Sequence, residues 1–229
     1  MPLIVKNTTF PSLLDLLAPH SCRGCGLIGS PLCNRCKNYI YNQHHNFCPR
    51  CKASTPTGIC DHCKDLPPTF VATERAGLID ELIHDYKYSS NRSLAKPLAD
   101  VLNNCLPDSI CPVTIVPLPT ISKHLRSRGF DHTRLIAKRL TKLHKDWRVE
   151  PLLLRANSTV QVGSTKKDRV SQASKAYEIN PKIKINPKST YLLIDDVWTT
   201  GASMEAAVKK LQQAGVSQIA IGILAVSTI

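Results

Sequence analysis

Short apolar runs alternate along the chain with longer segments in which apolar residues recur every three or four positions. Runs of the first kind predict strands over Phe70–Ala76, Val113–Val116, Tyr191–Ile194 and Ile219–Val226. Helical spacing predicts helices over Asp80–Tyr88, Ser93–Leu102, Thr133–Leu143 and Ala202–Gln213. Because strands that alternate with helices form sheets covered by helices, we expect an α/β fold with a mainly parallel sheet.

The first 66 residues follow a different pattern. A short apolar helix is predicted within Phe10–Leu17, with Ser12 placed to cap it, and the rest consists of short polar segments between cysteines. The run Leu66-Pro67-Pro68 marks a boundary, since adjacent prolines stop regular structure. We therefore expect two domains, a small Cys-rich domain over 1–66 and the α/β domain over 67–229.

Eight of the ten cysteines lie in the first of these domains as four Cys-x-x-Cys pairs. The pairs are Cys22/Cys25, Cys33/Cys36, Cys48/Cys51 and Cys60/Cys63. This spacing lets one turn give two thiolates to a tetrahedral Zn²⁺, so four pairs predict two structural zinc sites. The spacing leaves open whether consecutive or alternate pairs share an ion. Eight thiolates satisfy two ions, so the neighbouring His44, His45 and His62 are expected to be bystanders.

Neither a membrane span nor an export signal is predicted. The longest apolar stretches, near Leu13–Leu17 and Ile219–Val226, are well short of the ~20 residues that cross a bilayer. Met1–Phe10 has no apolar core of the kind that secretory signals carry. The pattern favours a cytoplasmic protein, in which reduced thiols bind zinc rather than form disulfides.

Positive charge is concentrated in the middle of the chain. The net charge is +13, and residues 120–190 hold 17 Lys and Arg against 5 Asp and Glu, which gives +12. Such a surface attracts polyphosphates or the backbone of a nucleic acid, and its alternative is a solvated, solubilising face. Aromatic residues are only 5% of the chain, so extensive base stacking is disfavoured.

One segment, Leu192–Ser203, combines a buried strand, two carboxylates, a hydroxyl-rich turn and the start of a helix. Free N–H groups at the start of a helix, with Thr and Ser hydroxyls beside them, favour a phosphate. Asp195 and Asp196 can accept from sugar hydroxyls or hold a hydrated Mg²⁺. The segment lacks the glycine patterns of dinucleotide and nucleoside triphosphate sites, so it predicts a phosphorylated sugar as ligand.

This segment resembles the phosphoribosyl pyrophosphate (PRPP) motif of type I phosphoribosyltransferases. The resemblance implies that Asp195 and Asp196 meet the ribose hydroxyls and the metal. It also implies that a five-residue loop wraps the 5′-phosphate, formed by Thr199, Thr200, Gly201, Ala202 and Ser203.

Two positions in the segment depart from relatives in that superfamily. Thr199 stands where purine-salvage members place an Asp that acts as a base, so purine salvage is disfavoured. Trp198 replaces a small aliphatic residue, which changes the floor of the pocket without removing the phosphate site.

Other segments resemble the competence protein F (ComF) family, which joins an N-terminal zinc module to this transferase fold. The similar segments are Asp85–Tyr88, Val116–Pro119 with Lys123, Arg126, Arg128, Gly129 and Phe130, and Gln161–Gly163 with Arg169, Ala176 and Tyr177. Asp131-His132 and Gln172 depart from the Asn-Gln and Asn that are usual there. The resemblance extends from about Pro11 to Val226.

The resemblance also implies roles in a reaction that expels pyrophosphate from PRPP. Arg126 and Arg128 would bind the pyrophosphate, since an Arg fork bonds phosphate oxygens in pairs; their alternative is a basic, solvent-facing turn. Gln161–Lys175 would close as a lid through Lys166, Lys167 and Arg169, and a plain surface loop would have the same composition. Asp195, Asp196 and Arg169 are the catalytic candidates, and no residue is identified as the nucleophile.

Three functions remain open from the sequence. The favoured one is a ComF-like protein that binds PRPP with Mg²⁺ and handles single-stranded DNA during natural transformation, with DNA-uptake proteins as partners. The alternative is an active phosphoribosyltransferase that has an unknown acceptor and no direct DNA role. The third is a zinc module that docks partner proteins beside a vestigial sugar-phosphate site. Cys105 and Cys111 are expected to be buried thiols, and His124 and His132 surface or helix-edge residues.

Overall fold

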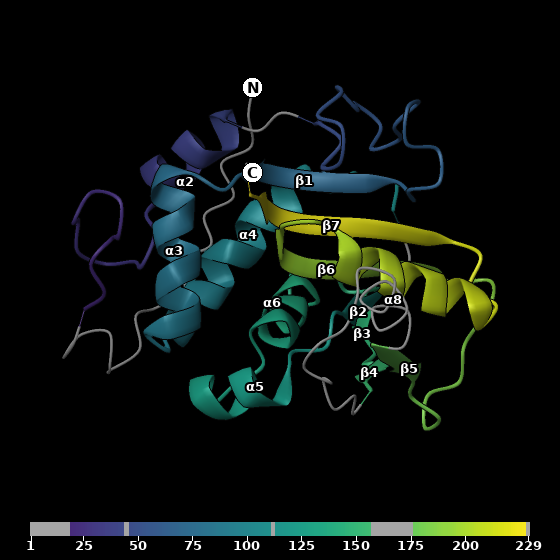
Figure 1. The fold of residues 1–229 in the computed structure, drawn as a ribbon. Coiled ribbons are helices and arrows are strands. Elements are labelled where there is room, and N and C mark those ends of the chain that lie inside the picture. Colours follow the sequence, from purple (N-terminus) through teal and green to yellow (C-terminus); the bar gives the residue numbers. More distant parts are fainter. Residues whose placement is uncertain (1–18, 44–45, 111–112, 157–175, 228–229) are drawn as a thin grey trace, which may run out of the picture.

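A parallel sheet of five strands forms the centre of the computed structural model, which describes residues 19–43, 46–110, 113–156 and 176–227 (Figure 1). The strand order is β1-β7-β6-β2-β3, and all four pairings are parallel. The strands are β1 (Thr69–Glu74), β2 (Val113–Pro117), β3 (Arg148–Val149), β6 (Thr190–Trp198) and β7 (Ile219–Val226). The α/β prediction with a mainly parallel sheet is confirmed.

Helices cover the two faces of this sheet unequally. Apolar residues of α3 (Gly77–Tyr88), α4 (Ala95–Cys105) and α6 (His132–Leu140) pack against Leu192 and Ile194 of β6. On the other face α8 (Ala202–Gln213) packs against Tyr191 and Leu193. Because successive side chains of a strand point to opposite faces, β6 divides its residues between two apolar clusters.

Smaller elements complete the described part of the chain. The strands β4 (Leu153–Arg155) and β5 (Tyr177–Ile179) pair antiparallel in a second sheet near α8 (Figure 1). The remaining helices are α2 (Asn34–Asn42), the 3₁₀ turn η1 (Arg92–Leu94) and α5 (Ser122–Arg128). Among the described residues, no helix combines the length and the apolar character needed to span a bilayer. The helix predicted within Phe10–Leu17 lies outside the described residues.

The predicted boundaries of these strands and helices lie within three residues of those observed, except at the end of β6. The predicted bounds of α8 and β7 match those observed, whereas β6 continues four residues beyond the predicted end at Ile194. The extension pairs with β7, in which every residue is buried, through Asp195 opposite Ile223 and Trp198 opposite Val226. The two carboxylates therefore lie within the strand, near its carboxyl end.

The two halves of the cysteine-rich region pack on opposite sides of the sheet. Cys22 and Cys36 belong to the apolar cluster of α3 and α4, whereas Cys48 and Cys63 belong to that of α8. An ion pair of 2.8 Å from Lys37 to Asp100 adds a polar link to α4. The division into domains at residue 66 stays a prediction.

Candidate functional site

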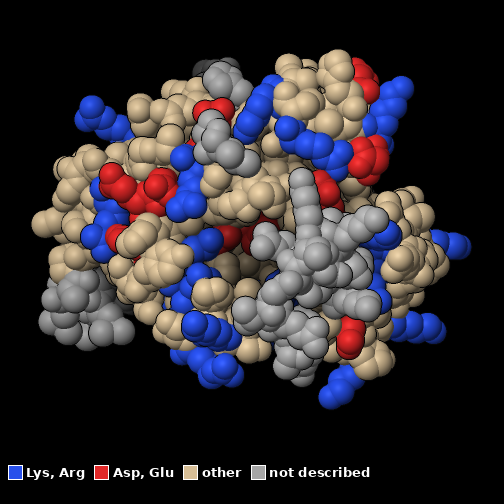
Figure 2. Space-filling view, in the orientation of Figure 1, with Lys and Arg blue, Asp and Glu red and all other residues tan. Residues whose placement is uncertain are grey.

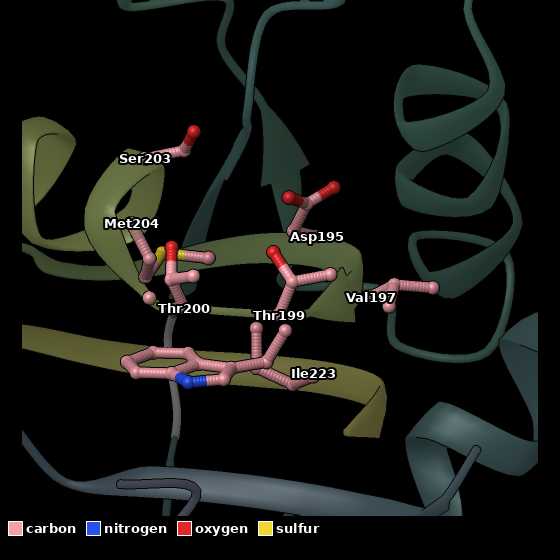
Figure 3. Close-up of a pocket in the computed structure, with 9 residues that line it drawn as sticks. Asp195, Val197, Thr199, Thr200, Ser203, Met204 and Ile223 are labelled. Atoms are coloured by element: carbon pink, nitrogen blue, oxygen red, sulfur yellow. The ribbon is translucent and has the colours of Figure 1, made fainter. Parts of the chain in front are cut away.

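The loop between β6 and α8 borders a small cavity of about 70 Å³ whose lining includes Asp195, Thr199, Thr200 and Ser203. Figure 3 shows the hydroxyls of these Thr and Ser residues directed to the same side as the Asp195 carboxylate. Ala202 begins α8, and its N–H donates to Thr200 Oγ1 at 3.5 Å. The arrangement offers hydroxyl donors and a helix start to an anion, as the sequence predicts.

The turn into α8 depends on Gly201, whose φ of 79° lies in the left-handed region. A Cβ at this position would collide with the ring of Trp198, which is buried beneath the loop. The indole therefore forms the floor of the small cavity, and only glycine fits above it. The sequence flagged Trp198 as unusual, and this packing shows what its bulk requires of the loop.

Asp195 and Asp196 occupy different surroundings although they are adjacent. Asp195 is half-buried, borders the small cavity, and accepts a hydrogen bond of 2.9 Å from the backbone N–H of Asp196. Asp196 is buried against α3 and α6, where its Oδ2 lies 2.9 Å from both Lys87 Nζ and His132 Nε2. Among the described residues, no Lys, Arg or His side chain is within hydrogen-bond distance of Asp195. This carboxylate therefore faces the loop without a cationic partner.

The two carboxyl groups also differ in the direction in which their pKa values are shifted. Burial raises the pKa of Asp195 well above its usual value, and the neighbouring charge of Asp196 raises it more. Burial also opposes ionisation of Asp196, but the hydrogen bond from His132 and the charge of Lys87 outweigh burial and lower its pKa. The site thus holds one firmly ionised carboxylate and one that is costly to ionise until a cation or a donor reaches it.

The tautomer of His132 follows from its neighbours. Arg128 Nη1 lies 3.0 Å from Nδ1, and Thr120 Oγ1 lies 3.3 Å from the same nitrogen. Because a guanidinium has no acceptor, Nδ1 must accept, and Nε2 carries the proton that is donated to Asp196. His132 therefore connects the basic helix α5 to the acid of β6.

A larger cavity of about 280 Å³ adjoins the loop at the carboxyl end of the sheet. Both carboxylates line it, together with six basic side chains, which are Arg75, Lys87, His124, Arg128, His132 and Arg155. Figure 2 shows acidic atoms deep in a hollow near the centre of this face, with basic groups beside and below it. A cavity with a basic rim and an acidic floor suits a ligand that has phosphates at its ends and hydroxyls between them.

Most of the predicted phosphate and sugar residues meet at these two cavities. Asp195, Thr199 and Ser203 line both of them, and Arg128 and Asp196 line the larger one. Arg126 is exposed on α5 and is not among the residues lining either cavity. Arg169, Lys166, Lys167 and the predicted lid Gln161–Lys175 lie outside the described residues.

The sequence did not assign several cavity residues. Lys87 belonged to a segment noted only for its resemblance, and His132, one of the surface or helix-edge candidates, is 6% exposed at the start of α6. Arg155 was not singled out, although its Nη1 donates to the hydroxyl of Tyr177 at 2.8 Å. If the strand had been predicted to continue to Trp198, Asp196 would have been expected to be buried. Because a buried carboxylate needs a partner, that expectation would have pointed to cationic residues such as Lys87 and His132.

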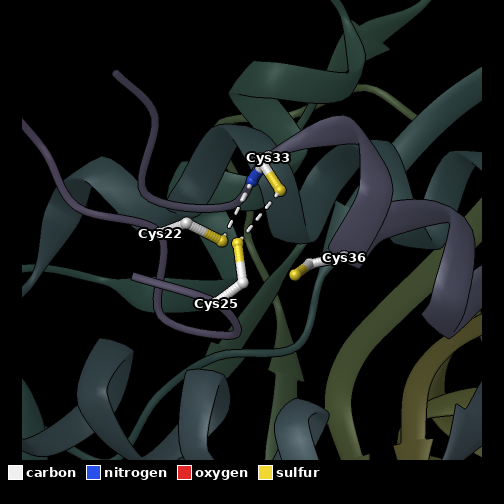
Figure 4. Close-up of side chains that lie close together, drawn as sticks. All are labelled: Cys22, Cys25, Cys33 and Cys36. Carbon is white, nitrogen blue, oxygen red and sulfur yellow. Dashed lines mark hydrogen bonds between the residues drawn. The ribbon is translucent and has the colours of Figure 1, made fainter. Parts of the chain in front are cut away.

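The cysteines form two clusters, and consecutive pairs share each one. Ligand atoms of Cys22, Cys25, Cys33 and Cys36 lie within 4.8 Å of one another, as do those of Cys48, Cys51, Cys60 and Cys63. Figure 4 shows the first cluster, in which the Sγ atoms of Cys25 and Cys33 are 3.6 Å apart. The question that the spacing left open is thereby answered in favour of two successive sites.

The first cluster has the chemistry of a zinc site. Burial raises the pKa of the Cys22 thiol, but N–H donors from Cys33, Cys25 and Gly24 outweigh burial and lower it to about 6. One of these donors, the N–H of Cys33, lies 3.3 Å from Cys22 Sγ. Four sulfur atoms around one point match tetrahedral zinc, so each cluster could hold one ion.

Comparison with known proteins agrees with this architecture. No protein-family model matches the chain. Competence protein F of Haemophilus influenzae is 24% identical over 214 residues, which cover 87% of this chain and 93% of that protein. The chain is a homologue of competence protein F. The ComF resemblance therefore extends over most of the chain, and the two four-cysteine clusters fit the paired zinc ribbon that it implies.

Proposed function

We propose that the protein binds PRPP with Mg²⁺ at the carboxyl end of β6 and handles single-stranded DNA during natural transformation. The observation that carries the proposal is the lining of the larger cavity. Asp195, Thr199 and Ser203 line it together with the basic Arg128 and Lys87. PRPP carries its 5′-phosphate and its pyrophosphate on either side of a ribose with free hydroxyls, so its charges and hydroxyls match the residues that line this cavity.

The residues divide the ligand between them in this proposal. The 5′-phosphate binds the five-residue loop from Thr199 to Ser203, and the ribose hydroxyls donate to Asp195. Pyrophosphate binds near Arg128, with Arg126 and Arg169 approaching from α5 and from the segment predicted to close over it. Asp196 acts behind them, where it holds Lys87 and His132 at the cavity wall.

The proposal assigns Mg²⁺ to Asp195. Bound with PRPP, Mg²⁺ supplies positive charge that neutralises the pyrophosphate oxygens. Asp195 is the carboxylate available to such an ion or its water, because Lys87 and His132 already contact Asp196. A nearby cation would also favour the ionised form of Asp195, the form that accepts from ribose hydroxyls.

The DNA role is supported by the name of the relative and by charge. The homologue is a competence protein, and residues 120–190 of this chain carry a net charge of +12. On α5, Lys123 and Arg126 are exposed close to the larger cavity, which Arg128 of the same helix lines. We propose electrostatic contact with the DNA backbone and little sequence preference, with DNA-uptake proteins as partners.

Calorimetry tests the ligand. PRPP with Mg²⁺ should bind the wild-type chain and raise its melting temperature, since a ligand of the native state stabilises that state. Asp195→Asn should abolish binding, whereas Asp146→Asn, at an exposed acid in the turn before β3, should leave it unchanged. Equal binding by the wild-type chain and Asp195→Asn would refute the assigned ribose site.

Anisotropy with a labelled thymidine oligonucleotide tests the DNA role. Binding should weaken steeply as salt rises, and Lys123→Gln with Arg126→Gln should weaken it further. Salt-insensitive binding, or none, would contradict the DNA role. Release of pyrophosphate from PRPP in the presence of a small-molecule acceptor, without DNA binding, would instead support the alternative of an active phosphoribosyltransferase.

A further inference from the structure

Arg50 links the second cysteine cluster to the helix that carries the proposed phosphate loop. It lies between Cys48 and Cys51, and its Nη2 donates to Glu205 Oε1 at 2.8 Å. Its Nη1 donates to both carboxylate oxygens of Asp65, at 2.8 and 3.0 Å. One guanidinium therefore joins two carboxylates that are far apart in the sequence.

Glu205 lies in the first turn of α8, directly after the loop. Its backbone N–H donates to the carbonyl of Gly201 at 2.9 Å, so the residue that bonds Arg50 is also bonded to the loop. A carboxylate near a helix start favours the helix but repels an anionic ligand at the same place. Arg50 supplies the positive charge that compensates Glu205.

Apolar packing also connects the second cysteine cluster with α8. Cys48 and Cys63 share one buried cluster with Met204 and Val208 of α8. Met204 also lines the small cavity beside the loop. The second cysteine cluster and α8 thus belong to the same apolar cluster, and the ion pair of Arg50 links them at the first turn of the helix.

We propose that Arg50 is a positioning residue for the phosphate loop, which it serves by fixing the first turn of α8 to the second cysteine cluster and by neutralising Glu205. The inference rests on the proposed function, because it concerns affinity at the same loop. It adds that the metal-binding module contributes to ligand binding without touching the ligand.

Ribose 5-phosphate and inorganic pyrophosphate serve as separate probes in calorimetry, because ribose 5-phosphate carries the 5′-phosphate that the loop receives. Arg50→Gln should weaken the binding of ribose 5-phosphate roughly two- to five-fold, the range expected for loss of a partly exposed ion pair. The affinity for pyrophosphate should be unchanged. Arg50→Gln with Glu205→Gln should restore the affinity, since no uncompensated carboxylate remains. Arg50→Lys should fall between wild type and Arg50→Gln, because an ammonium keeps the charge but cannot join two carboxylates as a fork does.

The first cluster provides a matched control. Arg35 precedes Cys36 as Arg50 precedes Cys51, but it lies on α2. Arg35→Gln should therefore leave the affinity for both probes unchanged. Zinc content and melting temperature establish that each variant is folded. If Arg50→Gln does not fold, Glu205→Gln alone tests whether the charge of Glu205 opposes the ligand. This variant should bind ribose 5-phosphate at least as tightly as wild type. Weaker binding by Glu205→Gln would overturn the inference.

The remaining outcomes separate this inference from the proposed function. Wild-type affinity for ribose 5-phosphate in folded Arg50→Gln would overturn the inference and leave the phosphate site standing. Equal losses for both probes would overturn it also, since they would indicate general loosening. A wild-type chain that binds neither probe would refute the proposed function and the inference with it.

Discussion

Lys87 and Asp196 form an ion pair of 2.9 Å between the last turn of α3 and the carboxyl end of β6. The carboxylate is 4% exposed and the lysine side chain 16%, so the pair is largely shielded from solvent. His132 approaches the same oxygen at the same distance. Two elements from separate parts of the chain are thus held against one strand by a single carboxylate.

Removal of the lysine should destabilise the fold. Lys87→Met leaves His132 as the remaining close partner of Asp196, and loss of one member of a buried pair costs roughly 3 kcal/mol. Urea denaturation should show that loss as a lower transition midpoint, whereas Lys182→Met, at an exposed lysine, should change the midpoint little. A midpoint for Lys87→Met equal to wild type would show that the pair contributes nothing to stability.

Asp195→Asn should stabilise the ligand-free protein while it removes ligand binding. The raised pKa of Asp195 means that the folded state disfavours the charged form. The resulting stability is present at low pH and is lost as pH rises through the folded pKa. An amide keeps an acceptor for the Asp196 N–H and carries no charge, so the melting temperature above that pKa should rise. A lower melting temperature would show that the Asp195 charge stabilises the fold.

The pH dependence of stability should reverse for Asp196. Its lowered pKa adds stability that is fully present above about pH 4, the usual carboxyl range, and is lost as pH falls through the folded pKa. The difference in unfolding free energy between wild type and Asp196→Asn should therefore shrink from pH 7 to pH 3, as measured by chemical denaturation. A difference that stayed constant over this range would contradict the assigned charge state.

The sequence predicted the central strands, α8 and the hydroxyl-rich loop between β6 and α8, because each of these depends on residues that are adjacent in the chain. Runs of apolar residues gave β7, and the hydroxyls after β6 marked the loop. The partners of Asp196 depend instead on how α3 and α6 pack on β6, so no local pattern indicated Lys87 or His132. The grouping of cysteines also depends on packing, because the Cys-x-x-Cys spacing is the same in every pair.

The two cysteine clusters should each hold one zinc ion. Titration with a thiol reagent should release two equivalents from the wild-type chain, and Cys60→Ser with Cys63→Ser should release one, because these two thiols belong to the second cluster only. The first cluster packs on α3 and α4, on the other side of the sheet, so its ion should remain. Loss of both equivalents in this variant, with the fold intact, would mean that the clusters are not independent.

His132 should exist as the Nε2–H tautomer when it is neutral. Arg128 can only donate, so Nδ1 must be the acceptor, and the proton on Nε2 then lies on the line to Asp196. Long-range ¹H–¹⁵N spectra at pH 8 distinguish the two tautomers by their nitrogen shifts. In Arg128→Met the Nδ1 shift should change, because its donor at 3.0 Å is lost, while the Nε2 proton should stay, held by Asp196. An Nδ1–H tautomer in the wild-type chain would break the connection between α5 and β6, because Arg128 would then face a donor.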